Sequence, residues 1–364
     1  MIRIEKTLCT LLFFCIVSQL ALAQGTITPK LIWAVNKVDL GTVLEEQGPQ
    51  VAEFQFTHTQ DSLFFIEKVL TDCGCTTVEY TQDTLQVGES GTLQVSFDPS
   101  SGAGFFSRMI VVKGNLFGVQ DTLYIEGRAI PRASNPEETY RTRKGDLGFR
   151  LSKINMGEVL TNGPKVKQVE IYNFGDKPFY KDSLMYVGPE YIQVEQLTDS
   201  IMPNDRGLIQ LHYDGAMKND LGYFEDQISL NWQDSSTYID LDVLADVFEY
   251  YAPFAKNKLG LVPQLVLEPK EIDLKTIKAT AIQVEYVTLS NRGKQVLEVR
   301  KIQGNCECLK LELPKTTLDP GESIQLKVVF DPKERKGIDQ RNIYIFSNDP
   351  VNPVQLFLLK SRVE

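Results

Sequence analysis

Residues 86–99 read QVGESGTLQVSFDP, and the pattern returns as MPNDRGLIQLHYDG at 202–215 and as DPGESIQLKVVFDP at 319–332. Each stretch is a polar turn, then a run with apolar residues at every second position, then an aromatic residue and an aspartate. This alternation is typical of a half-buried β-strand. The closing aspartates are 116 and 117 residues apart: Asp98, Asp214 and Asp331. The chain therefore carries a repeated module, and we expect each aspartate to cap a turn rather than to act as an acid or base.

Three more features recur with the same period. A short first strand reads VDLGTV at 38–43, INMGEV at 154–159 and IDLKTI at 272–277. A later strand ends in a turn that holds Asn173 and Asn291, with His58 at the matching place of the first copy. A glycine-led strand closes on an asparagine in every copy: Asn115, Asn231 and Asn348. Features that recur in one order indicate three copies of one fold.

The two histidines are not expected to form a site. His58 flanks a turn, where we expect it at the surface. His212 lies on an alternating strand, and the alternation points its side chain outward. Because the two residues belong to different copies, the sequence argues against a shared catalytic or metal-binding role.

Each copy is predicted to hold about seven short strands separated by turns, which is typical of an immunoglobulin-like β-sandwich. The expected fold class is all-β, with three tandem sandwiches after a cleaved signal peptide. Neither Trp33 nor Trp232 completes the Cys–Trp–Cys spacing of true immunoglobulin domains. The predicted segments are a signal peptide at 1–23 and sandwiches at 27–131, 146–248 and 262–364.

The two linkers differ in composition. Residues 131–146 mix charge, asparagine and proline with few apolar residues, and we expect this segment to be flexible. Residues 249–263 carry an aromatic cluster that we expect to pack at a domain junction: Tyr250, Tyr251 and Phe254. A carbohydrate platform is the other use considered for this cluster.

The first residues predict export. Arg3 and Lys6 precede the apolar stretch 8–22, and small residues stand at Ala21 and Ala23, so we expect cleavage after Ala23. Lipidation is not favoured, because Cys15 lies in the middle of the apolar run. No later segment is apolar enough to span a membrane. The formal net charge of −10 argues against nucleic acid and anionic membranes as partners.

The mature chain would keep four cysteines, in two Cys-x-Cys pairs: Cys73, Cys75, Cys306 and Cys308. The pairs lie 233 residues apart, two periods of the repeat, and the matching segment 186–191 has no cysteine. In an extended strand the paired Cα atoms would be roughly 6.5 Å apart, so a disulfide requires a bend, which Gly74 can supply. Four interpretations stay open: an inert disulfide, a soft-metal site for copper or zinc, a redox site, and covalent bonding to a partner.

The stretches DCGCTTVEYTQDTLQVGESGTLQVSFDP and NCECLKLELPKTTLDPGESIQLKVVFDP resemble the bacterial family called domain of unknown function 1573. Its members share a Cys-Gly-Cys-Thr stretch, a Pro-Gly-Glu turn and a strand that ends near Asp-Pro. The resemblance implies immunoglobulin-like domains of the ASH and major-sperm-protein type, export in Gram-negative bacteria and no established activity. It carries over directly to Cys73 and Cys75, whereas Glu307 replaces the glycine between Cys306 and Cys308.

No catalytic motif is recognisable, so we expect no catalytic residues, no cofactor and no resident metal. The leading interpretation is a non-enzymatic, exported binding or scaffolding protein of the periplasm or cell surface. Its partners would be proteins that contact edge strands or end loops. The alternative is a thiol-redox or copper-handling periplasmic protein that uses Cys73, Cys75, Cys306 and Cys308.

Overall fold

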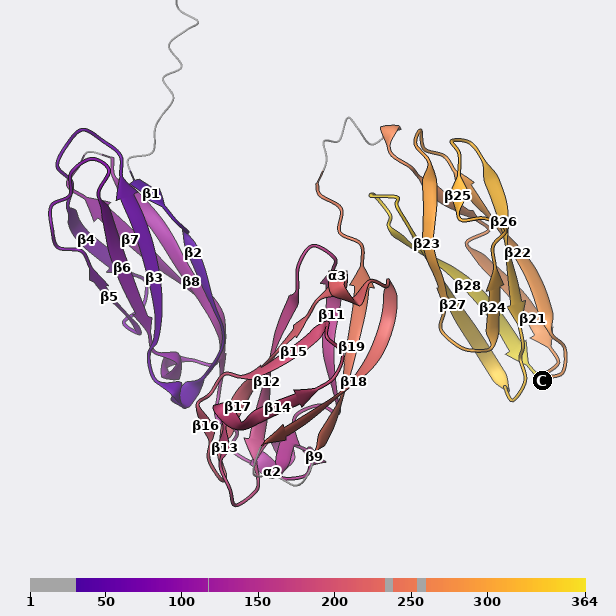
Figure 1. The fold of residues 1–364 in the computed structure, drawn as a ribbon, viewed down its shortest axis with the longest axis horizontal. Helices are drawn as coiled ribbons and strands as arrows, with labels where there is room; N and C mark the ends of the chain where they lie inside the picture. The colour runs from indigo at the N-terminus through magenta and orange to yellow at the C-terminus, as the bar shows by residue number, and fades with distance from the viewer. Residues whose placement is uncertain (1–30, 117, 233–237, 254–259) are drawn as a thin grey trace, which may run out of the picture. The chain divides into compact units, whose positions relative to one another are not determined.

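A computed structural model describes residues 31–116, 118–232, 238–253 and 260–364 (Figure 1). The chain is all-β, as predicted, and its described strands form three pairs of larger sheets, each pair with a separate hydrophobic core, and one two-stranded sheet. The predicted signal peptide at 1–23 lies outside the described residues, as does Phe254. None of the helices in the described ranges is long and apolar enough to cross a membrane.

The first sandwich comprises residues 31–130. One sheet has the order β1 (Leu31–Trp33), β3 (Gln50–His58), β6 (Ser90–Phe97), β5 (Thr76–Tyr80). The other has the order β2 (Lys37–Leu44), β8 (Gln120–Ile130), β7 (Gly104–Gly114), β4 (Ile66–Thr71). Short 3₁₀ turns lie at Glu45–Gln47 and Pro99–Ser101.

The second sandwich comprises residues 136–248. One sheet has the order β15 (Ile192–Gln196), β17 (Arg206–Tyr213), β12 (Lys165–Asn173), β10 (Leu147–Phe149), β9 (Thr142–Lys144). The other has the order β11 (Lys153–Leu160), β19 (Ile239–Phe248), β18 (Gly222–Trp232), β14 (Leu184–Val187). The smaller elements are α2 (Pro136–Thr139), α3 (Gly215–Lys218), a 3₁₀ turn at Lys181–Ser183, and the pair β13 (Phe179–Tyr180) with β16 (Ser200–Ile201).

The third sandwich comprises residues 265–363. One sheet has the order β20 (Leu265–Glu268), β22 (Gln283–Asn291), β26 (Ser323–Phe330), β24 (Leu309–Glu312). The other has the order β21 (Glu271–Ile277), β28 (Val354–Val363), β27 (Gly337–Ser347), β23 (Leu297–Gly304), β25 (Thr317–Leu318). By compactness alone the chain divides into 1–133 and 134–364, so the predicted domain boundaries stay predictions.

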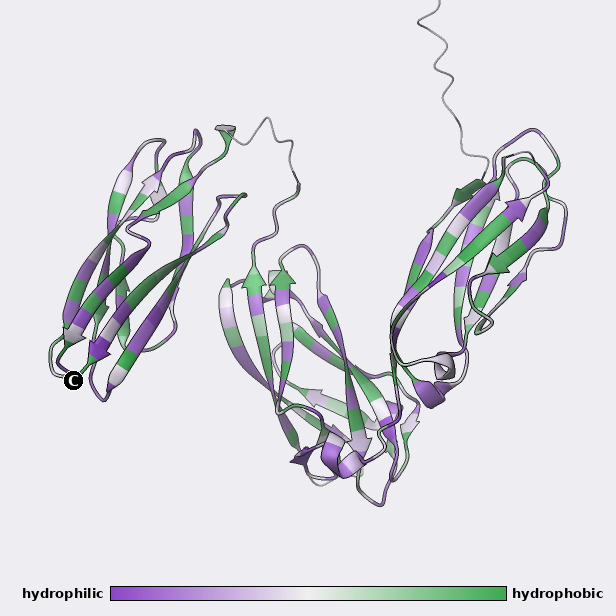
Figure 2. Cartoon of the chain, turned by 180° about the vertical axis from the view of Figure 1, so that it is seen from behind, coloured by the Kyte–Doolittle hydropathy of each residue, from purple (hydrophilic) through white to green (hydrophobic). Residues whose placement is uncertain are grey.

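Alternation along the strands builds the cores. In β6, Leu93, Val95 and Phe97 are fully buried while the residues between them face solvent. Figure 2 shows the same alternation of hydrophobic and hydrophilic residues along strands of all three sandwiches. Each core therefore draws its apolar side chains from both sheets of its own sandwich.

The repeated aspartates cap turns, as the sequence predicts. Asp98 Oδ1 accepts a hydrogen bond from the backbone N–H of Ser100 at 2.9 Å. Asp214 accepts from the N–H groups of Ala216 and Met217 at 2.9 and 3.0 Å. Asp331 accepts from the N–H of Lys333 at 3.0 Å. These bonds satisfy backbone donors that would otherwise have no partner where the strand ends.

The prediction of a surface position for His58 is wrong. Its side chain is fully buried, and Nε2 lies 2.6 Å from the carbonyl oxygen of Ser62. Asn173 and Asn291 make the equivalent hydrogen bond in the other copies. Each side-chain amide donates to the carbonyl four residues further on, at 2.7 and 2.8 Å. His58 is thus an internal turn brace, whereas His212 on β17 is half-buried and lies 3.3 Å from Glu195, outside the core.

The prediction of a flexible linker at 131–146 is also wrong for most of its length. The strand β9 pairs with β10, and Tyr140 is completely buried. The Tyr140 hydroxyl donates to Glu170 Oε1 at 2.6 Å, and Arg206 Nη1 donates to the same oxygen at 2.6 Å. The side chains of Glu170 and Arg206 are only 3% and 2% exposed. One tyrosine and a buried ion pair therefore hold a polar segment on the second sandwich.

Candidate functional site

The Cys-x-Cys pairs lie where the chain crosses from one sheet of a sandwich to the other. Cys73 and Cys75 stand between β4 and β5, which are edge strands of the two sheets (Figure 1). Cys306 and Cys308 stand between β23 and β24 at the same crossing of the third sandwich. The crossing from β14 to β15 in the second sandwich runs through Pro189 and Tyr191 instead. The three crossings occupy the same position in the fold, but only the first and third carry cysteines.

Both pairs are disulfides, Cys73–Cys75 and Cys306–Cys308, and both hold their Cα atoms 5.2 Å apart. This distance is shorter than in an extended strand, so the expected bend is present. Gly74 stands in this bend, but the bend does not require glycine. Gly74 does not use a left-handed backbone conformation, a Cβ there would meet nothing within 4 Å, and Glu307 occupies the same place.

The turn is held by the same backbone hydrogen bonds in all three copies. The carbonyl of the first residue accepts from the N–H three residues later, at 3.2 Å for Cys73, 3.0 Å for Pro189 and 3.4 Å for Cys306. The carbonyl two residues on accepts from the N–H of the capping aspartate, at 2.9 Å for Cys75, 2.8 Å for Tyr191 and 2.9 Å for Cys308. Since the second copy makes this turn without sulfur, the disulfides are not needed for the backbone path.

The sulfurs of the first pair have polar neighbours. The backbone N–H of Cys75 donates to Cys73 Sγ at 3.1 Å, and the Thr76 hydroxyl lies 3.8 Å from Cys75 Sγ. Cys75 packs against the core, and both cysteines are partly exposed. Thr71 Oγ1 also donates to the carbonyl of Cys73, at 3.2 Å.

Extending the strand register by two residues sets an arginine opposite the first pair. The N–H of Asp72 donates to the carbonyl of Met109 at 3.3 Å, which continues the register that pairs Thr71 with Ile110. The next pair in this register is Cys73 and Arg108. Counting seven residues back from the closing asparagine gives Arg108 in the first copy, Phe224 in the second and Arg341 in the third. The repeat spacing alone therefore aligns Arg108 with Arg341, whereas the Cys-x-Cys motifs carry no sign of either arginine.

The second sandwich has a hydrogen-bonded cluster where the others have sulfur. Asp226 accepts from the hydroxyls of Tyr191 and Tyr213, at 2.7 and 2.6 Å, and from Lys218 Nζ at 2.8 Å. Burial by itself would raise the pKa of Asp226, but these three donors outweigh it and the pKa lies below its usual value. Burial and the bond to Asp226 raise the pKa of Tyr213. The cluster therefore combines an ionised carboxylate with neutral phenols.

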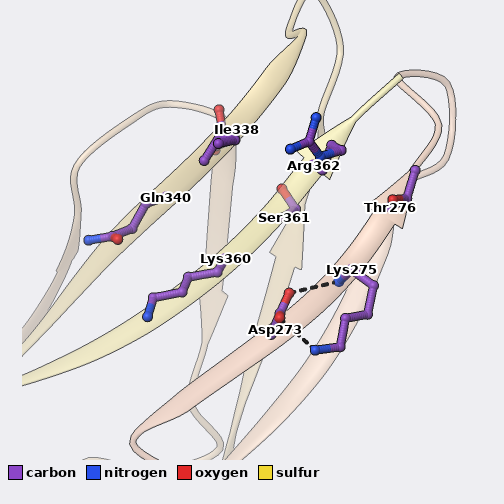
Figure 3. A pocket seen from close by; sticks show the side chains of 9 residues that line it. Asp273, Lys275, Thr276, Ile338, Gln340, Lys360, Ser361 and Arg362 are labelled. Carbon is purple, nitrogen blue, oxygen red and sulfur yellow. Dashed lines mark hydrogen bonds and ion pairs between the residues drawn. The ribbon is translucent and has the colours of Figure 1, made fainter.

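A shallow groove of about 340 Å³ lies on the third sandwich (Figure 3). Asp273 there accepts from the N–H of Lys275 at 2.9 Å and from Lys275 Nζ at 2.7 Å. Lys360, on the neighbouring strand, donates to Glu271 at 2.7 Å. These charges are paired with each other across an exposed sheet face. Across the described ranges, no group of three or more His, Cys, Asp or Glu side chains is placed to hold a metal.

The aromatic cluster at 249–263 is only partly described. The hydroxyl of Tyr251 donates to Glu249 at 2.6 Å and to the carbonyl of Ser347 at 3.2 Å, while Tyr250 is 39% exposed. The bond from Tyr251 to Ser347 agrees with the expected packing of this segment, and the carbohydrate interpretation stays untested.

Comparison with known proteins gives a family and distant folds. The family described as "Protein of unknown function (DUF1573)" matches residues 31–129 and 265–361. No curated protein matches the sequence. A protein of unknown function from Porphyromonas gingivalis is 13% identical, with a TM-score of 0.45 over 60% of this chain and 100% of that one.

Two further solved structures are still more distant. One is a C. elegans member of the MSP family, 14% identical, with a TM-score of 0.20 over 28% of this chain and 97% of that one. The other is a structure of titin immunoglobulin domains, 8% identical, with a TM-score of 0.21 over 92% and 98%. Scores this low carry no argument about function.

Proposed function

Because the chain belongs to the DUF1573 family, described as proteins of unknown function, we propose a role from its own surfaces. The protein is a non-enzymatic, exported binding or scaffolding protein. Its partner is a protein segment in extended conformation that adds to an open sheet edge. The observation that carries the proposal is one uninterrupted edge strand at the same place in each sandwich: β5, β15 and β24.

Each of these strands leaves backbone groups pointing outward. In β5 the carbonyl of Cys75 and the N–H of Thr81 bond toward β6, so the even-numbered residues between them face the open edge. Val78 lies at the middle of that edge, and the corresponding residues are Val194 on β15 and Leu311 on β24. No described residue pairs with Val78 on its outer side.

Several other edges of the same sandwiches are irregular. Register shifts interrupt the pairing of the edge strands β2, β11 and β21 with their parallel neighbours, and of the edge strand β4 with its antiparallel neighbour. Bulges of this kind discourage strand addition, whereas regular edges permit it. The strands β5, β15 and β24 have no such shift in their pairing. β5, β15 and β24 share one further feature: each begins directly after the turn that crosses from one sheet to the other.

Export is supported by the charged, apolar and small-residue order of residues 1–23. We place the mature protein in the periplasm or at the cell surface of a Gram-negative bacterium. N-terminal sequencing of the protein from fractionated cells is expected to find Gln24 first, in the periplasmic or membrane-associated fraction. A chain that still begins at Met1 in the cytoplasm would contradict export.

Strand addition is tested by a photo-crosslinking amino acid at the exposed position Thr77 in the producing cell. We expect discrete adducts with a protein partner, identified by mass spectrometry. Val78→Pro should reduce their yield at least tenfold, because it removes an outward N–H without touching the ladder to β6. Val78→Ala is the matched control, since it trims the side chain and keeps that N–H.

Two results would contradict the edge-strand proposal. One is an adduct yield that is unchanged by Val78→Pro in protein that is folded by circular dichroism. The other is an equal loss with Val78→Ala, which keeps the outward N–H and would therefore show that this N–H is not what holds the partner. The copper-handling alternative gains no support from the described residues, which add no third metal ligand to either sulfur pair.

A further inference from the structure

The two disulfides share one backbone geometry but differ in the groups around their sulfurs. We propose that Cys73–Cys75 is a thiol–disulfide exchange site that accepts two electrons from a dithiol, and that Cys306–Cys308 does not exchange under the same conditions. This goes beyond the binding role proposed above and does not depend on it.

The first difference is the charge opposite the first cysteine. Arg108 stands at the register position opposite Cys73; its guanidinium lies 5.6 Å above the Phe97 ring, and its buried Nε has no hydrogen-bond partner. No described carboxylate pairs with Arg108; its one hydrogen bond is a 3.4 Å contact from Nη1 to the carbonyl of Ser107. A cation without a counter-ion is available to stabilise a thiolate.

In the third sandwich the equivalent guanidinium is paired with a carboxylate, Asp339, which also accepts from Arg335 Nη1 at 3.4 Å. Gly304 pairs with Ile343, so Arg341 stands opposite Cys306. Arg341 donates through Nε and Nη2 to both carboxylate oxygens of Asp339, which is 7% exposed. A bidentate ion pair of this kind leaves the guanidinium little charge to offer a sulfur.

The second difference lies in the hydrogen bonds to sulfur. In the first pair the N–H of Cys75 donates to Cys73 Sγ at 3.1 Å, and the Thr76 hydroxyl lies 3.8 Å from Cys75 Sγ. Leu309 stands at the position of Thr76 in the third sandwich and has no hydroxyl. Among residues 260–364, no hydrogen bond to either sulfur is present. Donors aimed at sulfur favour the reduced, charged form.

The third difference is the residue between the cysteines. Gly74 is neutral and leaves the space above the turn open, since a Cβ there would meet nothing within 4 Å. Glu307 places a carboxylate between Cys306 and Cys308, and a like charge disfavours a thiolate. All three differences make the first pair easier to reduce than the third-sandwich pair.

The exchange step balances as follows. A thiolate of the dithiol attacks Cys73 Sγ, because Cys75 packs against the core and is less accessible. The Cys73–Cys75 bond breaks, and Cys75 is the leaving group. Its sulfur lies beside the Thr76 hydroxyl and takes up a proton. The second thiol of the dithiol loses its proton and attacks the mixed disulfide. Cys73 leaves as a thiolate that the Cys75 N–H and Arg108 stabilise. Two electrons reach the protein, and the dithiol becomes a disulfide.

The test compares the two pairs in one molecule. The full mature protein is equilibrated in buffers of reduced and oxidised dithiothreitol, quenched with acid, alkylated, and read by peptide mass spectrometry. We expect the equilibrium constant for reducing Cys73–Cys75 to exceed that for Cys306–Cys308 at least tenfold, which corresponds to about 30 mV. Equal constants, or a higher constant for Cys306–Cys308, would overturn the proposal without needing any variant.

Variants then assign the cause. Arg108→Gln should lower the equilibrium constant for reducing Cys73–Cys75 at least threefold and move alkylation of Cys73 to higher pH. Arg108→Lys keeps the positive charge and should show the wild-type constant and the wild-type pH dependence. Arg341→Gln is the matched control and should leave Cys306–Cys308 unchanged. If Arg108→Gln, folded by circular dichroism, keeps the wild-type constant, the assignment to Arg108 fails. The double graft Glu307→Gly with Leu309→Thr should raise the Cys306–Cys308 constant.

Discussion

Glu170→Ala is expected to destabilise the second sandwich by about 3–5 kcal/mol, the cost of removing one partner from a buried ion pair. Glu170 accepts from Tyr140 and Arg206 at 2.6 Å each and also pairs with Arg150. Its loss leaves a guanidinium that is 2% exposed without this carboxylate. It also removes the acceptor that holds Tyr140, so the segment 136–144 should detach from the sheet.

Trp232 makes this measurable in the whole protein. The chain has two tryptophans, and Trp232 is 2% exposed in the core of the second sandwich. In a Trp33→Phe background its fluorescence reports urea unfolding of that sandwich alone. The double variant Glu170→Leu with Arg206→Met is the control and should recover the part of the loss that comes from the unpaired Arg206, because it removes both buried charges together. A loss below about 1 kcal/mol for Glu170→Ala would refute the anchoring role.

Asp226→Ala is expected to lower the free energy of unfolding of the same sandwich by about 3–5 kcal/mol. The substitution leaves two phenol hydroxyls and an ammonium without the carboxylate that accepts from all three. Lys218 and Asp226 are only 11% and 12% exposed, so water replaces the lost bonds poorly. The positions of Asp226 in the other copies hold Ile110 and Ile343. Replacing Asp226 alone by an aliphatic residue would still destabilise this sandwich, because the three groups that donate to Asp226 would remain.

The same residue makes the second sandwich acid-sensitive. The pKa of Asp226 in the folded chain lies below the ordinary value of 3.8. Its ionised form therefore adds stability above pH 3.8, and this is lost as the pH falls through the folded pKa. Trp232 fluorescence in urea between pH 2 and 6 should show this loss. Asp226→Asn, the matched variant, should show a smaller change over the same range. An identical pH profile in both proteins would contradict this account.

The all-β class and the sandwiches followed from the sequence because alternation and turn residues recur with one period. The capping aspartates were also predictable, since Asp98 acts on a residue two positions away. The packing of 136–144 was not, because Tyr140 meets its partner Glu170 across 30 positions on the outside of a sheet. His58 was misplaced because a histidine there does the bracing that asparagines do in the other copies.

The position of the disulfides could be predicted from the sequence, but the residues around their sulfurs could not. The cysteine spacing indicated a disulfide at a bend, and the repeat indicated that one copy does without it. The proposed difference between the two pairs was hidden, because Arg108 and Thr76 are ordinary strand residues until the fold sets Arg108 opposite Cys73 in register and Thr76 beside Cys75 Sγ. Asp339, which ties up Arg341, lies two positions from it and has no sequence signature of its own.

Backbone hydrogen bonds, rather than the disulfide, are expected to hold the turn between β4 and β5. The most direct test is the free energy of unfolding of the first sandwich without its disulfide. In a Trp232→Phe background, Trp33 reports that sandwich in urea. Cys73→Ala with Cys75→Ala should cost about 1.5 kcal/mol or less, the closure entropy of so short a loop. A loss above about 4 kcal/mol, or the end of cooperative unfolding, would show that the disulfide is a structural staple and contradict the account.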